Sequence, residues 1–108
     1  MARRMFRQGD LLFIEVEGVP KGRFERVHDN VIQRGEAGGH AHQLIGGKLY
    51  RGWTTEGNRR SYVMFIVIES VGKVVHEEHG EIVLEKGTWM VVRQREYSPQ
   101  KGFEYVLE

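Results

Sequence analysis

Apolar and polar residues alternate along most of this chain, which is the period-two pattern of β-strands with one buried face. In residues 11–17, for example, Leu12, Ile14 and Val16 fall on one face. The run of residues 62–68 is apolar without interruption, which is typical of a strand covered on both faces and predicts that it forms the centre of the fold. Shorter strands are predicted over residues 31–34, 40–45, 48–53, 74–76, 82–84, 89–97 and 103–107.

Turns rich in glycine separate these strands. Gly46 and Gly47 lie between two of them, and a two-residue spacer is typical of a hairpin whose turn needs positive φ angles. Residues 85–87 and 98–102 are predicted to be turns as well. No segment has a helical pattern, and about seven to nine short antiparallel strands must close or stack. The sequence therefore predicts an all-β fold, a small antiparallel barrel or jelly-roll, in one domain that spans residues 1–108.

Composition narrows the classes of function. The 108 residues are enough for one domain with a modest core. Sixteen Lys and Arg against 15 Asp and Glu give a net charge of +1, so no global field favours nucleic acid or a membrane. The absence of cysteine excludes disulfides, thiolate zinc sites and thiol catalysis. With no apolar run of membrane-spanning length and no secretory signal pattern, we expect a soluble, cytoplasmic protein without membrane contact.

Four of the five histidines occur as two close pairs. His40 and His42 are two residues apart, so on a strand both imidazoles project from the same face. His76 and His79 would face opposite ways on a regular strand. Either a turn at the following glycine brings His79 inward beside His76, or Glu78, the same-face neighbour of His76, takes its place. We favour His79.

The two pairs together predict a site for one divalent transition metal ion, with His40, His42, His76 and His79 as ligands. Imidazole suits zinc, iron, nickel, manganese or copper, and the sequence does not distinguish among them. Three ligands would leave positions open for water or substrate, whereas four favour a structural role. The plainer alternative is that the histidines are ordinary polar residues at strand ends. His28 has the setting of a turn residue and is left out of the site.

The spacing around the first histidine pair resembles the first motif of the cupin superfamily. That motif has a glycine, a short spacer, His-x-His and a later glutamate. His40 and His42 match the histidines, and Gly35 lies one residue closer to His40 than in the motif. Gly46 and Gly47 stand at the positions where the glutamate is expected.

The second cupin motif, Pro-x-Gly followed by a histidine, is matched in part. Residues 85–87 have the form of its turn, but Met90 stands at the histidine position, and His76 and His79 would compensate. The resemblance covers about half of the chain and implies a cupin-like barrel with a metal site. The run Gly-Glu-x-x-Gly-His-Ala-His also resembles small uncharacterised bacterial and phage proteins, which implies no function.

Acidic and basic side chains near the histidines in the sequence are candidates for proton transfer and for substrate binding. Beside a metal-bound water, Glu78 or Glu77 could move protons as a general base. Arg93 and Arg95 alternate onto one face, and Arg95 would hold an anionic substrate group. Hydrolysis of a phosphoester is one predicted reaction, and oxygen-dependent or isomerase chemistry on a small carboxylate is another. A solvated strand edge that deters aggregation is the plainer alternative for the arginines.

A contrasting hypothesis is a non-catalytic module that contacts nucleic acid or protein. Basic residues cluster near the N-terminus and at residues 58–60, close in sequence to Tyr50, Trp53 and Tyr62. Aromatic and basic side chains together suit the stacking of bases and the binding of phosphates, provided that they lie on one side of the molecule. Open strand edges and aromatic side chains such as Trp53 also predict a homodimer or a higher homo-oligomer.

Overall fold

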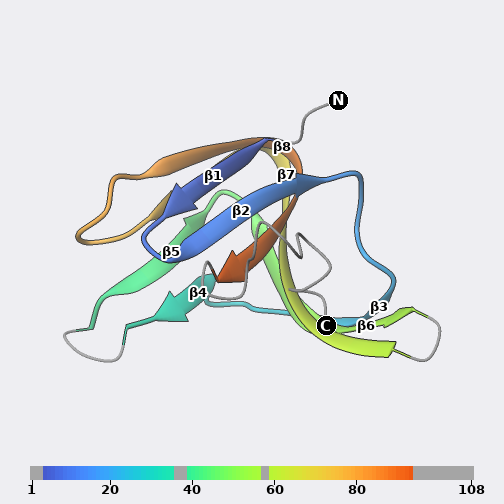
Figure 1. Cartoon of the computed structure of the whole chain (residues 1–108). Helices are drawn as coiled ribbons and strands as arrows, with labels where there is room; N and C mark the ends of the chain where they lie inside the picture. Colours follow the sequence, from blue (N-terminus) through green and yellow to red (C-terminus); the bar gives the residue numbers. More distant parts are fainter. Residues whose placement is uncertain (1–3, 36–38, 57–58, 94–108) are drawn as a thin grey trace, which may run out of the picture.

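The computed structural model describes residues 4–35, 39–56 and 59–93 (Figure 1). Within these residues all regular structure is antiparallel β-sheet, and there is no helix, which confirms the predicted all-β class. It follows that no helix of this part is long and apolar enough to cross a membrane. The strands are β1 (Met5–Gln8), β2 (Leu11–Val16), β3 (Gly22–Arg26), β4 (Val31–Arg34), β5 (Ala41–Ile45), β6 (Lys48–Glu56), β7 (Arg59–Val75) and β8 (Ile82–Arg93).

The long strand β7 organises the sheet. It pairs with β8 on one side, while on the other side its first half pairs with β6 and its second half with β5. The main strand order is β1-β2-β8-β7-β5-β4, and β3 extends the sheet beyond β6. Because β1 and β4 end this order without pairing with each other, the sheet of the described residues is not closed. The predicted barrel or jelly-roll is therefore not confirmed.

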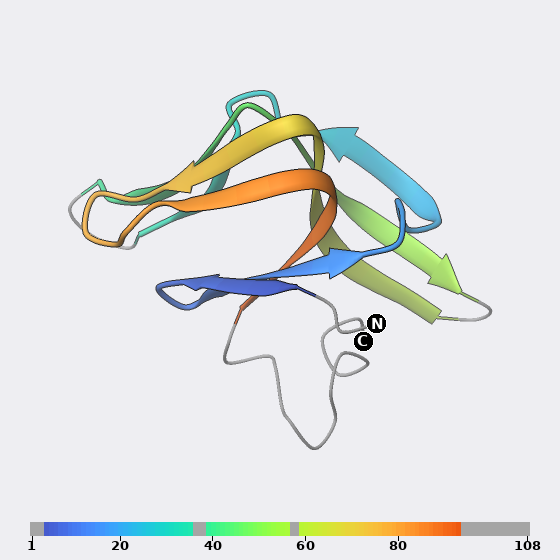
Figure 2. The same cartoon turned by 90° about the horizontal axis from the view of Figure 1, so that it is seen from above.

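A bulge bends β7 and β8 together about half-way along their length (Figure 2). Ile68 lies opposite Gly87 and Val71 opposite Glu85, so β7 has one extra residue at this point. Gly87 has a φ of 145°, a conformation that favours glycine. The sequence prediction of a turn at residues 85–87 is wrong, because the glycine bends one continuous strand instead of ending it.

The main core lies between the two halves of the folded sheet. Phe13 from β2 and Trp89 from β8 are fully buried in it, and the ring of Phe6 packs against Trp89 with 5.6 Å between centroids. The buried members of this cluster are Leu11, Phe13, Ile32, Leu44, Leu49, Ile66, Ile68, Val74, Leu84 and Trp89. Leu12 and Ile14 project from the opposite face of β2 and pack with Val92, so the alternation predicted for this strand is confirmed.

Two strands, two joins and one hairpin differ from the sequence prediction. The predicted hairpin at Gly46 and Gly47 is wrong, because β5 and β6 both pair with β7 and not with each other. The predicted strands 82–84 and 89–97 are joined in β8, as far as the described residues extend.

The short strands β1 and β3 were not predicted, because neither has a run of apolar residues at alternate positions. The segments 62–68 and 74–76, predicted as separate strands, belong to the single strand β7 with the exception of residue 76. The predicted turn at 98–102 and strand at 103–107 lie outside the described residues.

We expect Trp89→Ala to lower the free energy of unfolding by about 3–5 kcal/mol, because it removes a fully buried side chain at the centre of the main core. Urea denaturation followed by circular dichroism measures this change. Val83→Ala, at a position where the side chain is exposed on β8, is the control and should change the value by less than about 0.5 kcal/mol. Equal effects of the two substitutions would contradict this account of the core.

Candidate functional site

The pairing of β5 with the end of β7 brings the two histidine pairs together. Gln43 of β5 lies opposite Val75 of β7 in an antiparallel register. In such a pair the residues before Gln43 lie beside the residues that follow Val75. His42 lies in β5 with His40 just before it, and His76 directly follows β7. The first pair therefore lies next to the loop that holds His76 and His79.

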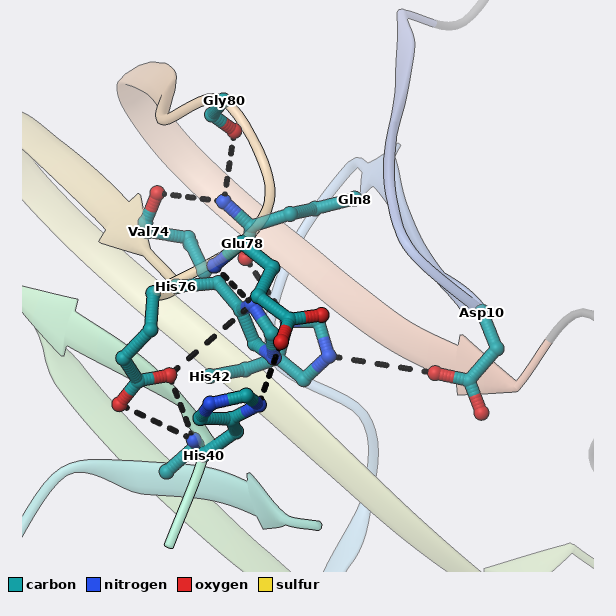
Figure 3. A network of polar contacts seen from close by, with 10 residues as sticks. Gln8, Asp10, His40, His42, Val74, His76, Glu78 and Gly80 are labelled. Atoms are coloured by element: carbon teal, nitrogen blue, oxygen red, sulfur yellow. Dashed lines mark hydrogen bonds and ion pairs between the residues drawn. The ribbon is translucent and has the colours of Figure 1, made fainter. Parts of the chain in front are cut away.

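All four predicted imidazoles lie in one cluster. The rings of His42 and His76 have centroids 4.4 Å apart, and those of His76 and His79 are 4.5 Å apart. His40 is 5.8 Å from His76, and His42 is 6.1 Å from His79. Figure 3 shows His40, His42 and His76 side by side, with Gln8 reaching in from β1. The predicted meeting of these side chains from two distant segments is thus present in the fold.

Gln8 fixes the orientation and the tautomer of His42. Its amide nitrogen donates to the backbone carbonyls of Val74 and Gly80, both at 2.9 Å. With both amide hydrogens used in this way, Oε1 is the atom that faces His42, at 2.8 Å from Nδ1. Nδ1 of the neutral ring must therefore carry the hydrogen and donate it, which leaves the lone pair on Nε2. Gln8 and His42 are both buried, so water does not compete for this contact.

Two glutamates tie the loop after β7 to the start of β5. The carboxylate of Glu77 accepts a hydrogen bond from the backbone N–H of Ala41, at 2.9 Å, and this bond lowers the pKa of Glu77 below its ordinary value. Oε1 of Glu78 lies 3.2 Å from Nδ1 of His40. The side chain of Glu78 is largely exposed. Glu77 thus has a positional role, and Glu78 is the more accessible of the two carboxylates.

His42 is held in its neutral form. Burial of the ring lowers the pKa of His42 below its ordinary value, and the neighbouring His76 lowers it further. Asp10, whose Oδ1 lies 3.9 Å from Nε2 of His42, acts in the opposite direction but is mostly exposed to solvent. A neutral imidazole with its lone pair on a buried Nε2 is the form in which histidine binds a metal ion.

The cluster in its present arrangement is not a formed metal site. Among the described residues, no group of three or more histidine, aspartate or glutamate side chains is arranged to hold an ion. One physical reason lies at His76, where Nδ1 accepts a hydrogen bond of 3.0 Å from the backbone N–H of Glu78. A neutral imidazole has a single lone pair, so this bond must break before His76 can bind a metal through either nitrogen.

Two further residues considered in the sequence analysis are Arg95 and His28. Arg95 falls outside the described residues, so its predicted role in binding an anion stays a prediction. His28, which the sequence analysis left out, lies in the segment between β3 and β4 and is exposed. It makes no ring contact with the other four histidines in the part of the chain that is described.

Sequence reasoning did not find Gln8 and Asp10. Both flank Gly9 in the turn between β1 and β2, and Gly9 has a φ of 60°. A Cβ at Gly9 would lie 2.9 Å from Nε2 of His79, so the turn approaches the cluster closely. The short polar run Gln8-Gly9-Asp10 was the available signal. Only the tertiary structure places it against histidines that are more than thirty residues away in the sequence.

A family model described as a domain of unknown function, DUF8820, matches residues 7–94 of this chain. The chain belongs to this family. Comparison with curated proteins and with solved structures gives no match. The DUF8820 match includes all four clustered histidines together with Gln8 and Asp10, so the candidate site belongs to the family domain.

Membership of DUF8820 corrects the cupin resemblance, because no cupin family matches the chain. The structure gives physical reasons for the failed motif. Met90, at the position of the last cupin histidine, is buried in an apolar cluster with Val63 and Phe65. Residues 85–87, which resemble the cupin turn, form part of the continuous strand β8. The His-x-His spacing alone is therefore not specific to the cupin superfamily.

In chelator-treated protein, we expect the free energy of unfolding to fall as the pH drops below about 6.5. The unfolded chain then protonates His42 at its ordinary pKa, whereas the folded chain protonates it only at a lower pH. The unfolded state binds more protons in this window, so acid favours unfolding there. Urea titrations between about pH 7 and pH 5 measure the slope, which His42→Gln should reduce. An unchanged slope in His42→Gln would contradict this assignment.

Proposed function

We propose that this protein binds a divalent transition metal ion through its histidine cluster. The observation that carries the proposal is the spacing of the rings, with centroids 4.4–6.1 Å apart. Four imidazoles bonded tetrahedrally to one ion, with metal–nitrogen distances of about 2.0–2.1 Å, would have ring centroids about 5 Å apart. The four ring pairs in contact already have spacings near this value, so binding requires rotation of the rings and a local shift of the loop after β7, not a refolding of the chain.

Gln8 supports the proposal because it prepares His42 for this role. Histidines that bind metals commonly donate their second ring N–H to a carboxylate or carbonyl group, which fixes the tautomer and the direction of the lone pair. The amide of Gln8 accepts from Nδ1 of His42 in the same way. A buried, oriented and neutral imidazole costs little to bring to a metal ion, because its reorganisation is already complete.

The loop of residues 76–80 is the part that must adjust. His76 has to give up the hydrogen bond from the backbone N–H of Glu78, and His79 is exposed. A shift of this loop would point the free nitrogens of both rings toward Nε2 of His42. His40, which is partly exposed, borders the solvent side of the cluster.

The reaction predicted from the sequence stays a prediction. If a metal-bound water lies on the open side of the cluster, Glu78 is the nearest candidate general base, because its carboxylate lies beside His40 and reaches solvent. Metal-dependent hydrolysis of a phosphoester would further need a group that holds the anionic substrate, the role predicted for Arg95.

We expect protein purified without a histidine tag to bind about one equivalent of Zn²⁺ or Co²⁺ per chain, measured by isothermal titration calorimetry and by the visible absorption of Co²⁺. His42→Ala and His76→Ala should each weaken binding by more than the roughly 10–100-fold that is typical for loss of a hydrogen-bond partner of a metal ligand. His28→Ala is the matched control, because His28 lies apart from the cluster, and should bind like the unmodified protein. If both cluster variants also bind like the unmodified protein, the proposal is wrong.

Gln8→Leu tests the orienting role separately, since it leaves all four histidines in place. We expect metal affinity to fall by about 10–100-fold, because Nδ1 of His42 loses its acceptor. Gln43→Leu on the exposed face of β5 is the control. Thermal unfolding of both variants shows whether the fold is kept. A folded Gln8→Leu protein with undiminished affinity would show that His42 does not depend on this contact.

A further inference from the structure

A row of basic and aromatic side chains lies on one face of the sheet formed by β3, β6 and the first half of β7. The histidine cluster lies at the other end of β7. Arg23 of β3, Trp53 of β6 and Tyr62 of β7 lie directly opposite one another in consecutive strand pairs. Directly opposite residues project from the same face of a sheet. Trp53 is 44% exposed and Tyr62 is 50% exposed, with 5.4 Å between the ring centroids. The row thus presents two adjacent aromatic rings to solvent.

Further arginines flank this row on the same face. Arg51 lies two residues from Trp53 along β6, and Arg60 lies two residues from Tyr62 along β7. The guanidinium of Arg60 lies over the indole of Trp53, 4.9 Å from its centroid. We call Arg23, Arg51, Trp53, Arg60 and Tyr62 the aromatic–arginine face.

The charge of this face is one-sided although the whole chain is nearly neutral. Glu25 is directly opposite Arg51 and pairs with it at 3.1 Å. Arg23 and Arg60 form no ion pair with a described acidic residue. In a protein with a net charge of +1, these arginines make a local positive field.

The rings of Trp53 and Tyr62 lie outside the apolar clusters of the described residues. The opposite face of the same strands carries Phe24, Val63 and Phe65, which pack with Met90. Tyr50, which the sequence placed with Trp53 and Tyr62, also belongs to that opposite face and stacks on Phe65 with 5.1 Å between centroids.

A pocket of about 490 Å³ continues from this face. Arg51 belongs to both, and Arg26, His28 and Arg34 are the other basic residues of the pocket lining. Arg34 pairs with Asp29 at 3.0 Å. The side chain of Arg26 makes no hydrogen bond or ion pair within the described residues, and its Nε is buried without a partner.

The pocket lining also includes Glu25 and Asp29, which pair with Arg51 and Arg34, and Arg26 lies on the face of Tyr50. The pocket therefore adjoins the aromatic–arginine face without extending its positive charge, and it has the size of a cavity that binds small ligands or single residues of a polymer.

We propose that the aromatic–arginine face binds single-stranded nucleic acid. Exposed aromatic rings stack on bases, and arginines beside them contact the phosphates, which is how proteins bind single strands without reading their sequence. A duplex would not offer its base faces to Trp53 and Tyr62. Trp, Tyr and Arg are also enriched at protein–protein interfaces. The positive charge of Arg23 and Arg60, which form no ion pair with a described acidic residue, favours a polyanion over a protein partner.

Fluorescence anisotropy with labelled oligo(dT) and oligo(U) of about 20 nucleotides tests the proposal and compares DNA with RNA. The assay uses the full chain at about 50 mM salt, because binding of this kind weakens with salt. We expect binding to one or both oligomers in the micromolar range or tighter. Trp53→Ala should weaken it by about 5- to 150-fold, the range for one lost base stack.

Two further variants separate stacking from phosphate contact. Trp53→Phe keeps an aromatic ring and should keep most of the affinity. In the unmodified protein, a base stacked on Trp53 should quench its fluorescence. Trp53→Phe should abolish this quenching, because the other tryptophan, Trp89, is fully buried. Arg60→Gln should reduce the slope of log affinity against log salt by about 0.7, the value for one phosphate contact on a single strand. Lys73→Gln, an exposed cation on the other half of β7, is the control and should leave affinity and slope unchanged.

The test is independent of the metal proposal. His42→Ala and chelator-treated protein should bind the oligonucleotides like the unmodified protein. The histidine cluster lies at the start of β5 and in the loop after β7, whereas the aromatic–arginine face lies on β3, β6 and the start of β7. No anisotropy change up to about 100 μM protein, the weak limit of non-specific binding, would overturn the proposal. The proposal would also be overturned if the protein binds no oligonucleotide and instead forms a dimer that Trp53→Ala dissociates. That result would show that the face joins two copies of the chain.

Discussion

The antiparallel pairing of β5 with the second half of β7 is the constraint on which the candidate site depends. This register places the residues before Gln43 beside those after Val75. β6 pairs with residues 59–67 of β7 and β5 with residues 73–75, so the two strands share one edge of β7 on either side of the bulge.

Hydrogen bonds from residues outside β5 and β7 then fix the positions of the side chains in the site. Gln8 comes from β1 and is held by the carbonyl groups of Val74 and Gly80, so the β1–β2 hairpin is fastened to the loop that follows β7. The same amide orients His42. Glu77 fastens that loop to the start of β5 through Ala41. Three separate segments therefore determine where the imidazoles lie, and the cost of burying His42 is offset by a satisfied hydrogen bond.

The two halves of the bent sheet present different chemistry. One half holds a buried, neutral imidazole among other histidines, and a neutral nitrogen with its lone pair free is a metal ligand. The other half buries Val63 and Phe65 on one face and exposes Trp53, Tyr62 and the arginines on the other. Because β7 runs through both halves, a single strand connects the two candidate sites. The DUF8820 match covers the residues of both.

The sequence by itself determined the all-β class, most of the strands and the two histidine pairs, because alternation and short spacings are local properties. It also indicated that a turn near Gly80 would bring His79 beside His76, and the rings are adjacent in the fold. Only the tertiary structure decided that residues 85–87 bend a strand, that Gln8 meets His42, and that Tyr50 faces away from Trp53. These depend on register between strands far apart in the chain, and a register shift of one residue moves every side chain to the opposite face without changing the local pattern.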